Sequence, residues 1–194
     1  HRYSSAASDV YKRQTETLCE EACVREAAEG KPVEIGRLQR YATDVSMRSE
    51  EHPYTRAKTT GKSVAIVGAG PAGLAAAHRL AMLGHEVDIF DAGVKPGGLN
   101  EFGIAAYKAT DNFAQEEVEW LLKIGGIKLH SGKALGKDFT LEDLSKSHNA
   151  TFIGIGLDSV RKLSLDKENL SNVENAVDFI ARLRQSSDLS LIHI

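Results

Sequence analysis

Strand-like runs alternate with helical patterns over the last two thirds of the chain. Strands are predicted at residues 64–67, 86–90, 127–129 and 150–155, the last of them buried. Helices are predicted over 71–83, from a cap at Asp111 to about Ile124, and over 172–184, and Thr140–Asp143 has the pattern of a capping box. This alternation is typical of an α/β fold in which a parallel sheet is covered on both faces.

The N-terminal part of the chain is more polar. Apolar side chains recur at helical spacing within residues 15–50, and residues 51–62 are polar, contain a proline and are expected to form a linker. We therefore expect a partial helical domain over 15–55 and a Rossmann-like domain over 62–185. Residues 1–14 and 186–194 resemble translated adapter sequence and are expected to be non-native tails, the alternative being disordered termini.

Composition and charge exclude several classes of protein. The 194 residues carry a formal net charge of −3, whereas a nucleic-acid-binding domain is usually markedly basic. No apolar run approaches the roughly 20 residues that span a bilayer, and no secretory signal is recognisable, so we expect a cytoplasmic protein that binds neither nucleic acid nor membrane. The two cysteines are then expected to be reduced thiols or metal ligands.

A glycine-rich motif follows the first predicted strand and opens the first predicted helix of the α/β region. In this GxGxxG context the first glycine permits the tight turn, the second lets backbone approach a pyrophosphate, and the third lets the helix pack close to the strand. The free N–H groups at the helix N-terminus would then bind the phosphates. The motif residues are Gly68, Ala69, Gly70, Pro71, Ala72 and Gly73.

An acidic residue ends the next predicted strand. Asp91 is placed to accept hydrogen bonds from ribose hydroxyls and would repel a 2′-phosphate, so the site is expected to hold FAD or NAD rather than NADP. The paired glycines Gly97 and Gly98 would let backbone pass an extended ligand, which favours FAD. The run Phe152–Gly156 is a later strand end at which the chain returns to the same cofactor. The alternative is a glycine turn without a ligand.

The two cysteines, Cys19 and Cys23, are four residues apart and would share one face of a helix. Two thiolates cannot fill the four ligand positions of an iron–sulfur cluster, and no histidine lies at ligand spacing from them. The pair is therefore either part of a larger metal site or two buried thiols without a ligand.

Two stretches of sequence resemble one family. Residues 18–24 with 32–41 resemble the N-terminal iron–sulfur domain shared by dihydropyrimidine dehydrogenases and glutamate synthase small subunits, which belong to one superfamily. Residues 98–108 more closely resemble the flavin subunit of the bacterial NAD(P)-dependent dihydropyrimidine dehydrogenases. The resemblance covers about residues 15–185. Ala105 stands where glutamate synthase small subunits usually have proline, which favours the pyrimidine branch.

The resemblance implies roles for individual residues. It implies that Cys19 and Cys23 ligate two different 4Fe-4S clusters and that Gln39, a glutamate in many glutamate synthase subunits, completes one of them. It also implies FAD contacts along 68–72 and 91–99, together with further single positions. The range 91–99 ends at Leu99, and the further positions are Lys108 and Leu135; the strand-end glycine predicted above is Gly156.

The departures from the family pattern are at both ends of the resemblance. Arg13–Gln14 occupy the place of a further Cys-Pro, and the second glycine-rich domain, which would bind NAD(P)H, is expected after Arg184 but is missing, so we expect this chain alone to be inactive.

The expected function is electron transfer from NAD(P)H through FAD and the clusters to an FMN-containing dihydropyrimidine dehydrogenase subunit, with no residue assigned a catalytic role. The alternatives are a glutamate synthase small subunit that serves a large subunit, and an FAD-binding module without turnover.

Overall fold

The computed structural model describes residues 18–106, 108–109, 111–157, 160, 170–171 and 173–186. These residues fall into two compact units, one within His1–Pro53 and Ala106–Phe113, the other within Tyr54–Ala105 and Ala114–Ile194. Each unit is described by itself. The expected tails, 1–14 and 186–194, lie outside the described residues except for Ser186.

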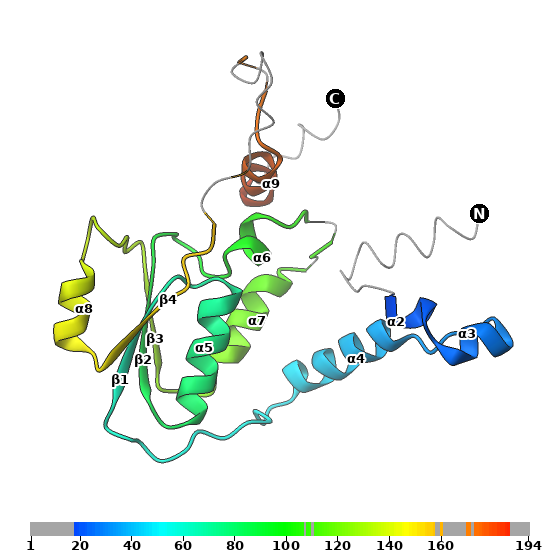
Figure 1. Ribbon diagram of the computed structural model, residues 1–194, viewed down its shortest axis with the longest axis horizontal. Helices are drawn as coiled ribbons and strands as arrows, with labels where there is room; N and C mark the ends of the chain where they lie inside the picture. Colours follow the sequence, from blue (N-terminus) through cyan, green and yellow to red (C-terminus); the bar gives the residue numbers. More distant parts are fainter. Residues whose placement is uncertain are drawn as a thin grey trace. The chain divides into compact units, whose positions relative to one another are not determined.

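The second unit contains one four-stranded parallel sheet (Figure 1). Its strands are β1 (Ser63–Val67), β2 (Glu86–Asp91), β3 (Ile127–Ser131) and β4 (Ala150–Ile153), in the order β3-β2-β1-β4. All three pairings are parallel. This order is that of the first strands of a Rossmann fold, and the predicted fold class is confirmed.

Helices cover both faces of the sheet (Figure 1). On one face, α5 (Pro71–Met82) and α7 (Phe113–Leu122) enclose a core that includes Ile66 and Ile89, both fully buried. On the other face, α8 (Leu141–Ser147) buries Leu144 against Ala65 and Val67. The side chains of β1 and β2 alternate between these two cores, which explains why both strands are rich in apolar residues.

Two further helices belong to this unit: α6 (Leu99–Phe102) and α9 (Ala176–Gln185), which contact each other. The capping box predicted at α8 is confirmed, since the Thr140 hydroxyl accepts from the Asp143 N–H and the Asp143 carboxylate accepts from the Thr140 N–H. Helix α9 begins at Ala176, later than the predicted 172.

Two predictions about local structure are wrong. Strand β4 is not buried: it lies at the edge of the described sheet, and Phe152 and Ile153 are 41% and 50% exposed. Asp111 does not cap α7, because Asp111 and Asn112 both have left-handed backbone conformations, with φ of 59° and 58°, and the helix begins after them at Phe113.

Most of the segment predicted as a linker is attached to the second unit. The Ala57 N–H donates to the Met82 carbonyl and the Thr60 N–H to the Gly84 carbonyl, both at 3.0 Å. The Arg56 guanidinium donates to Glu86 at the start of β2. This segment is therefore part of the α/β unit from Tyr54 onward.

The first unit contains three helices in the described residues: α2 (Leu18–Glu21), α3 (Val24–Glu29) and α4 (Ile35–Arg48). Gly30 ends α3 in a left-handed conformation, as a helix C-cap commonly does. Among the residues that the structure describes, none of the helices has the length and apolar character needed to cross a membrane.

Candidate functional site

The turn between β1 and α5 requires glycine at two positions. Gly68 has φ of +106°, and a Cβ there would lie 2.3 Å from the Gly154 carbonyl oxygen. A Cβ on Gly73 would lie 1.8 Å from the Gly68 carbonyl oxygen. Both neighbours are backbone atoms, so a side chain at either position would force the main chain to shift. These contacts support the tight turn expected at Gly68 and the close helix–strand packing expected at Gly73.

A second glycine turn packs against the first. A Cβ on Gly98, where φ is +53°, would lie 2.8 Å from the Cα of Gly70, and the Gly97 N–H donates to the Ala69 carbonyl at 2.8 Å. Gly70 itself has an open side, because a Cβ there would have only the Gly98 Cα, at 3.9 Å, within 4 Å. We call residues 68–70 with 97–98 the glycine cradle.

Asp91, at the end of β2, holds the cradle with both carboxylate oxygens. Its Oδ2 accepts from the Ala69 N–H at 2.5 Å, and its Oδ1 accepts from the Gly93 N–H at 2.7 Å. A carboxylate offers about four acceptor positions, so two remain for hydroxyl groups of a ligand. The structure therefore adds an organising role to the ribose-binding role that the sequence predicts.

The cradle lies where an open α/β sheet binds ligands. It follows the carboxyl ends of β1 and β2, and Gly154 follows the end of β4, on the other side of β1. The strand order changes direction between β1 and β4, which is the switch point at which such sheets form a ligand crevice. Helix α5 begins there at Pro71, with Gly70 as an N-cap that makes no side-chain hydrogen bond, so its N-terminus suits a pyrophosphate.

The other predicted ligand-binding residues are less closely tied to the cradle. Leu99 opens α6 and is 59% exposed, and Leu135 packs against the core beneath α8. A Cβ added to Gly156 would have nothing within 4 Å. The glycine next to the cradle is instead Gly154, whose carbonyl oxygen lies against Gly68 and which was not among the predicted ligand-binding residues. Lys108 belongs to the first unit. The ligand contacts assigned to these residues stay predictions.

The sequence did not predict a buried carboxylate next to the cradle, that of Glu101. Glu101, in α6, is 3% exposed and accepts from Gln115 Nε2 at 2.9 Å and from Gln185 Nε2 at 2.8 Å. Lys95 Nζ and an Arg184 nitrogen each lie 3.7 Å from its oxygens. Burial alone would raise its pKa, but the two amide donors and the two cations outweigh burial and lower the pKa. We call these five residues the Glu101 cluster.

No sequence signal marks that cluster, because its members come from distant positions. Gln115 is 14 residues from Glu101, and Gln185 is 84 residues away. A glutamate is normally solvent-exposed. Only the tertiary structure shows that this one is enclosed.

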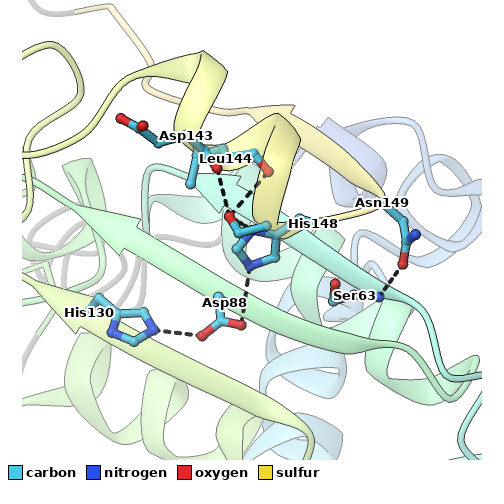
Figure 2. A network of polar contacts seen from close by, with 8 residues as sticks. Ser63, Asp88, His130, Asp143, Leu144, His148 and Asn149 are labelled. Carbon is cyan, nitrogen blue, oxygen red and sulfur yellow. Dashed lines mark hydrogen bonds and ion pairs between the residues drawn. The ribbon is translucent and has the colours of Figure 1, made fainter.

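A second polar network lies on the sheet face that α8 covers (Figure 2). Asp88, on β2, accepts from His130 Nε2 on β3 at 2.6 Å and lies 3.3 Å from His148 Nε2. Burial raises the pKa of Asp88, but the hydrogen bonds from the two imidazoles and their charge lower it below its ordinary value. The Phe90 ring stacks on His130 at a centroid distance of 4.7 Å.

The two cysteines lie in the first unit, one in α2 and the other just before α3. Cys19 is an exposed residue of α2, whereas Cys23 has extended backbone (φ −70°, ψ 131°) and precedes α3. The expectation of one shared helix face is therefore wrong, because the helix ends at Glu21, and the alternative of two buried thiols is also wrong. Backbone N–H groups of Val33, Arg25 and Glu26, together with the Arg25 charge, lower the pKa of the Cys23 thiol.

These residues do not complete an iron–sulfur site. Gln39 is an exposed residue of α4, and no three His, Cys, Asp or Glu side chains are grouped to hold a metal ion in the described part of the chain. The chain contains two cysteines, whereas a 4Fe-4S cluster takes four protein ligands. Any cluster bound to Cys19 or Cys23 therefore needs ligands other than these two thiolates.

Comparison with families of known proteins gives two matches. Residues 66–102 match the NAD(P)-binding Rossmann-like domain, and this range contains the end of β1, all of α5 and β2, and the whole cradle. Residues 13–51 match the dihydropyrimidine dehydrogenase domain II, 4Fe-4S cluster. The structure and these matches define the class: a Rossmann-like dinucleotide-binding domain preceded by a segment of the 4Fe-4S domain type.

The relatives are subunits of NAD(P)-dependent oxidoreductases. The chain is 36% identical over 178 residues to the NAD-dependent dihydropyrimidine dehydrogenase subunit PreT of Escherichia coli O157:H7, covering 91% of this chain and 42% of the relative. It is 33% identical over 164 residues to the glutamate synthase [NADPH] small chain of Azospirillum brasilense, covering 84% of this chain and 34% of the relative. The resemblance found in the sequence is thereby confirmed.

The fold is also similar to that of a solved oxidoreductase. Mycobacterium tuberculosis FprA in complex with NADPH superimposes with a TM-score of 0.54 at 26% identity, over 62% of this chain and 28% of that protein. Because the chain spans less than half of each of these relatives, the activity of the whole protein is a matter of proposal.

Proposed function

We propose that the α/β unit binds FAD at the glycine cradle. The observation that carries this proposal is the contact between the two glycine turns: Gly98 packs on Gly70, so that backbone of both turns lines one site at the N-terminus of α5. A mononucleotide would need only the first turn. An extended dinucleotide can contact both turns, and the family resemblance of residues 98–108 supports FAD as this dinucleotide.

The residues of the chain have distinct tasks in this proposal. The N–H groups that begin α5 bind the pyrophosphate, and Asp91 accepts hydrogen bonds from the ribose while it holds the loop through Ala69. FAD, when bound, supplies the ability to accept a hydride and release single electrons. The protein supplies position and electrostatics, and the absence of an acidic residue in the first turn of α5 suits the phosphates.

We further propose that the full-length protein is the electron-transfer subunit of an NAD(P)H-dependent dihydropyrimidine dehydrogenase, which passes electrons to an FMN-containing partner. The 36% identity to PreT supports this assignment. Gln39 and Ala105 support it too, since the resemblance associates both residue types with the pyrimidine branch. The chain has two cysteines, fewer than the four protein ligands of one 4Fe-4S cluster. The proposal therefore does not require this chain to hold a complete cluster by itself.

A glutamate synthase small subunit is the second candidate, because the Azospirillum brasilense relative is 33% identical. Full-length protein combined with each type of partner subunit separates the two candidates. Uracil-dependent NADH oxidation with the FMN-containing partner supports the pyrimidine assignment. Glutamine-dependent NADPH oxidation with the glutamate synthase large subunit, without uracil-dependent turnover, contradicts it.

The binding proposal is tested on the chain itself. Purified protein is titrated with FAD, and binding is followed by quenching of flavin fluorescence and by isothermal calorimetry. We expect saturable binding of one FAD per chain, and Gly98→Ala should abolish or greatly weaken it. FAD that fails to bind to a folded wild-type chain overturns the proposal. We expect NADH not to reduce the flavin bound to this chain, whichever of the three candidate functions holds, and reduction by NADH would contradict that expectation.

A further inference from the structure

The Glu101 cluster encloses the segment that leads into the second glycine turn. Gln115 Nε2 donates to the Glu101 carboxylate and, at 2.8 Å, to the Pro96 carbonyl. Lys95 Nζ donates to Gln185 Oε1 at 2.7 Å. Two consecutive residues before Gly97 are therefore held by groups that also hold Glu101.

The main chain of Glu101 also contacts the cradle. The Glu101 N–H donates to the Gly98 carbonyl at 3.1 Å, and a Cβ on Gly97 would lie 3.0 Å from the Glu101 Cβ. Gly97 in turn donates to Ala69. A continuous set of contacts thus runs from the Glu101 side chain to the first glycine turn.

On its other side, the cluster holds the end of α9. Gln185 is the last residue of that helix and donates directly to Glu101. Its neighbour Arg184 lies near Glu101 and donates to the Ile104 carbonyl at 2.8 Å, just after α6. No residue of α9 is buried, so polar contacts contribute much of its attachment to the unit.

We propose that Glu101 is a positioning residue that couples the docking of α9 to the shape of the glycine cradle, and therefore to cofactor binding. The inference rests on the proposed FAD site. A buried carboxylate with two amide donors and two nearby cations has one well-defined position, so it transmits a displacement of α9 to residues 95–98. Coupling between two sites is reciprocal: if docking of α9 strengthens cofactor binding at the cradle, cofactor binding must stabilise the docked position of α9 by the same free energy.

The test is hydrogen–deuterium exchange of the whole chain with and without FAD, together with the FAD dissociation constant. In wild type we expect saturating FAD to slow exchange of the α9 amides about tenfold, which is within the roughly 5–150-fold range for coupled sites. In Glu101→Ala we expect roughly tenfold weaker FAD binding and α9 exchange that no longer responds to FAD. A role confined to stability would lower the melting temperature without removing this response.

Two further variants keep the test decisive if Glu101→Ala does not fold. Gln185→Ala removes the amide donor of α9 and leaves the carboxylate with Gln115, Lys95 and Arg184, and it should weaken the response of α9 to FAD. Glu142→Ala is the control, since Glu142 is exposed on α8 and pairs only with Lys146, at 2.7 Å, among the contacts described; it should behave as wild type.

The outcomes distinguish this inference from the proposed function. Wild-type protein that binds FAD without any change in α9 exchange overturns the coupling and leaves the FAD site intact. Glu101→Ala or Gln185→Ala variants that keep the wild-type response overturn it as well. Wild-type protein that does not bind FAD overturns the proposed function itself.

Discussion

Replacing Asp91 by alanine tests the organisation of the cradle before any ligand is involved. The change removes two hydrogen bonds to a charged acceptor, from Ala69 N–H at 2.5 Å and from Gly93 N–H at 2.7 Å. A hydrogen bond to a charged group contributes about 1.5–3 kcal/mol. Asp91 is half-buried and water can replace part of the loss, so we expect the free energy of unfolding to fall by about 2–4 kcal/mol.

Urea unfolding of the ligand-free chain, followed by far-UV circular dichroism, measures this loss. The midpoint should fall by roughly 1–2 M urea while the slope stays the same, because the surface exposed on unfolding hardly changes. Asp138→Ala is the matched control: Asp138 also accepts from a backbone N–H, that of Ala134 at 2.8 Å, but on an exposed loop. We expect that control to cost less than about 1 kcal/mol.

The same variant also reports on ligand binding. Loss of the ribose acceptor should weaken FAD binding by about 1–3 kcal/mol, which is about five- to 150-fold in dissociation constant. A wild-type urea midpoint in Asp91→Ala would refute the organising role deduced from the two backbone contacts. An unchanged FAD affinity would show that the ribose is not bound at Asp91.

Three further changes test other parts of the structure. Gly98→Ala places a Cβ 2.8 Å from the Gly70 Cα and should cost about 1–3 kcal/mol in urea unfolding, whereas Gly132→Ala, also at positive φ but in open space, should cost about 1 kcal/mol. Equal losses would argue against close packing of the turns. Because the pKa of Asp88 is lowered, its contribution to stability is complete above the ordinary value of 3.8 and is lost as the pH falls through the lower folded value. Unfolding free energies measured below about pH 4 should therefore depend less steeply on pH in Asp88→Asn than in wild type, and identical slopes would contradict this. Thr140→Ala removes the capping box of α8 and should lower stability by about 1 kcal/mol in the same urea assay; no change would mean that α8 does not depend on its cap.

The sequence was sufficient to predict the α/β fold and the glycine motif because both depend on local rules. Alternating strands and helices define a parallel sheet, and the spacing of Gly68, Gly70 and Gly73 follows from the geometry of one turn. The capping box at Thr140 is equally local and was predicted correctly. Each of these features is specified within a few residues.

Features that depend on sheet order or on distant partners were not predictable in this way. The apolar run at Phe152 suggests a buried strand, but β4 is an edge strand in the described sheet, and burial depends on neighbours rather than on composition. The contact of Gly154 with Gly68 requires β1 and β4 to be adjacent. The enclosure of Glu101 requires α9, 84 residues further along the chain at Gln185, to return to α6.

The protein's own hydrogen bonds hold the cradle together: the Ala69 N–H donates to the Asp91 carboxylate, and the Gly97 N–H donates to the Ala69 carbonyl. Fixing the backbone of one residue costs roughly 1–2 kcal/mol of conformational entropy. For the three residues 68–70, this cost of about 3–6 kcal/mol is met when the chain folds rather than when a cofactor arrives. A dinucleotide that binds at the cradle, as we propose, should therefore lose little chain entropy in the loop and need no slow rearrangement of residues 68–70.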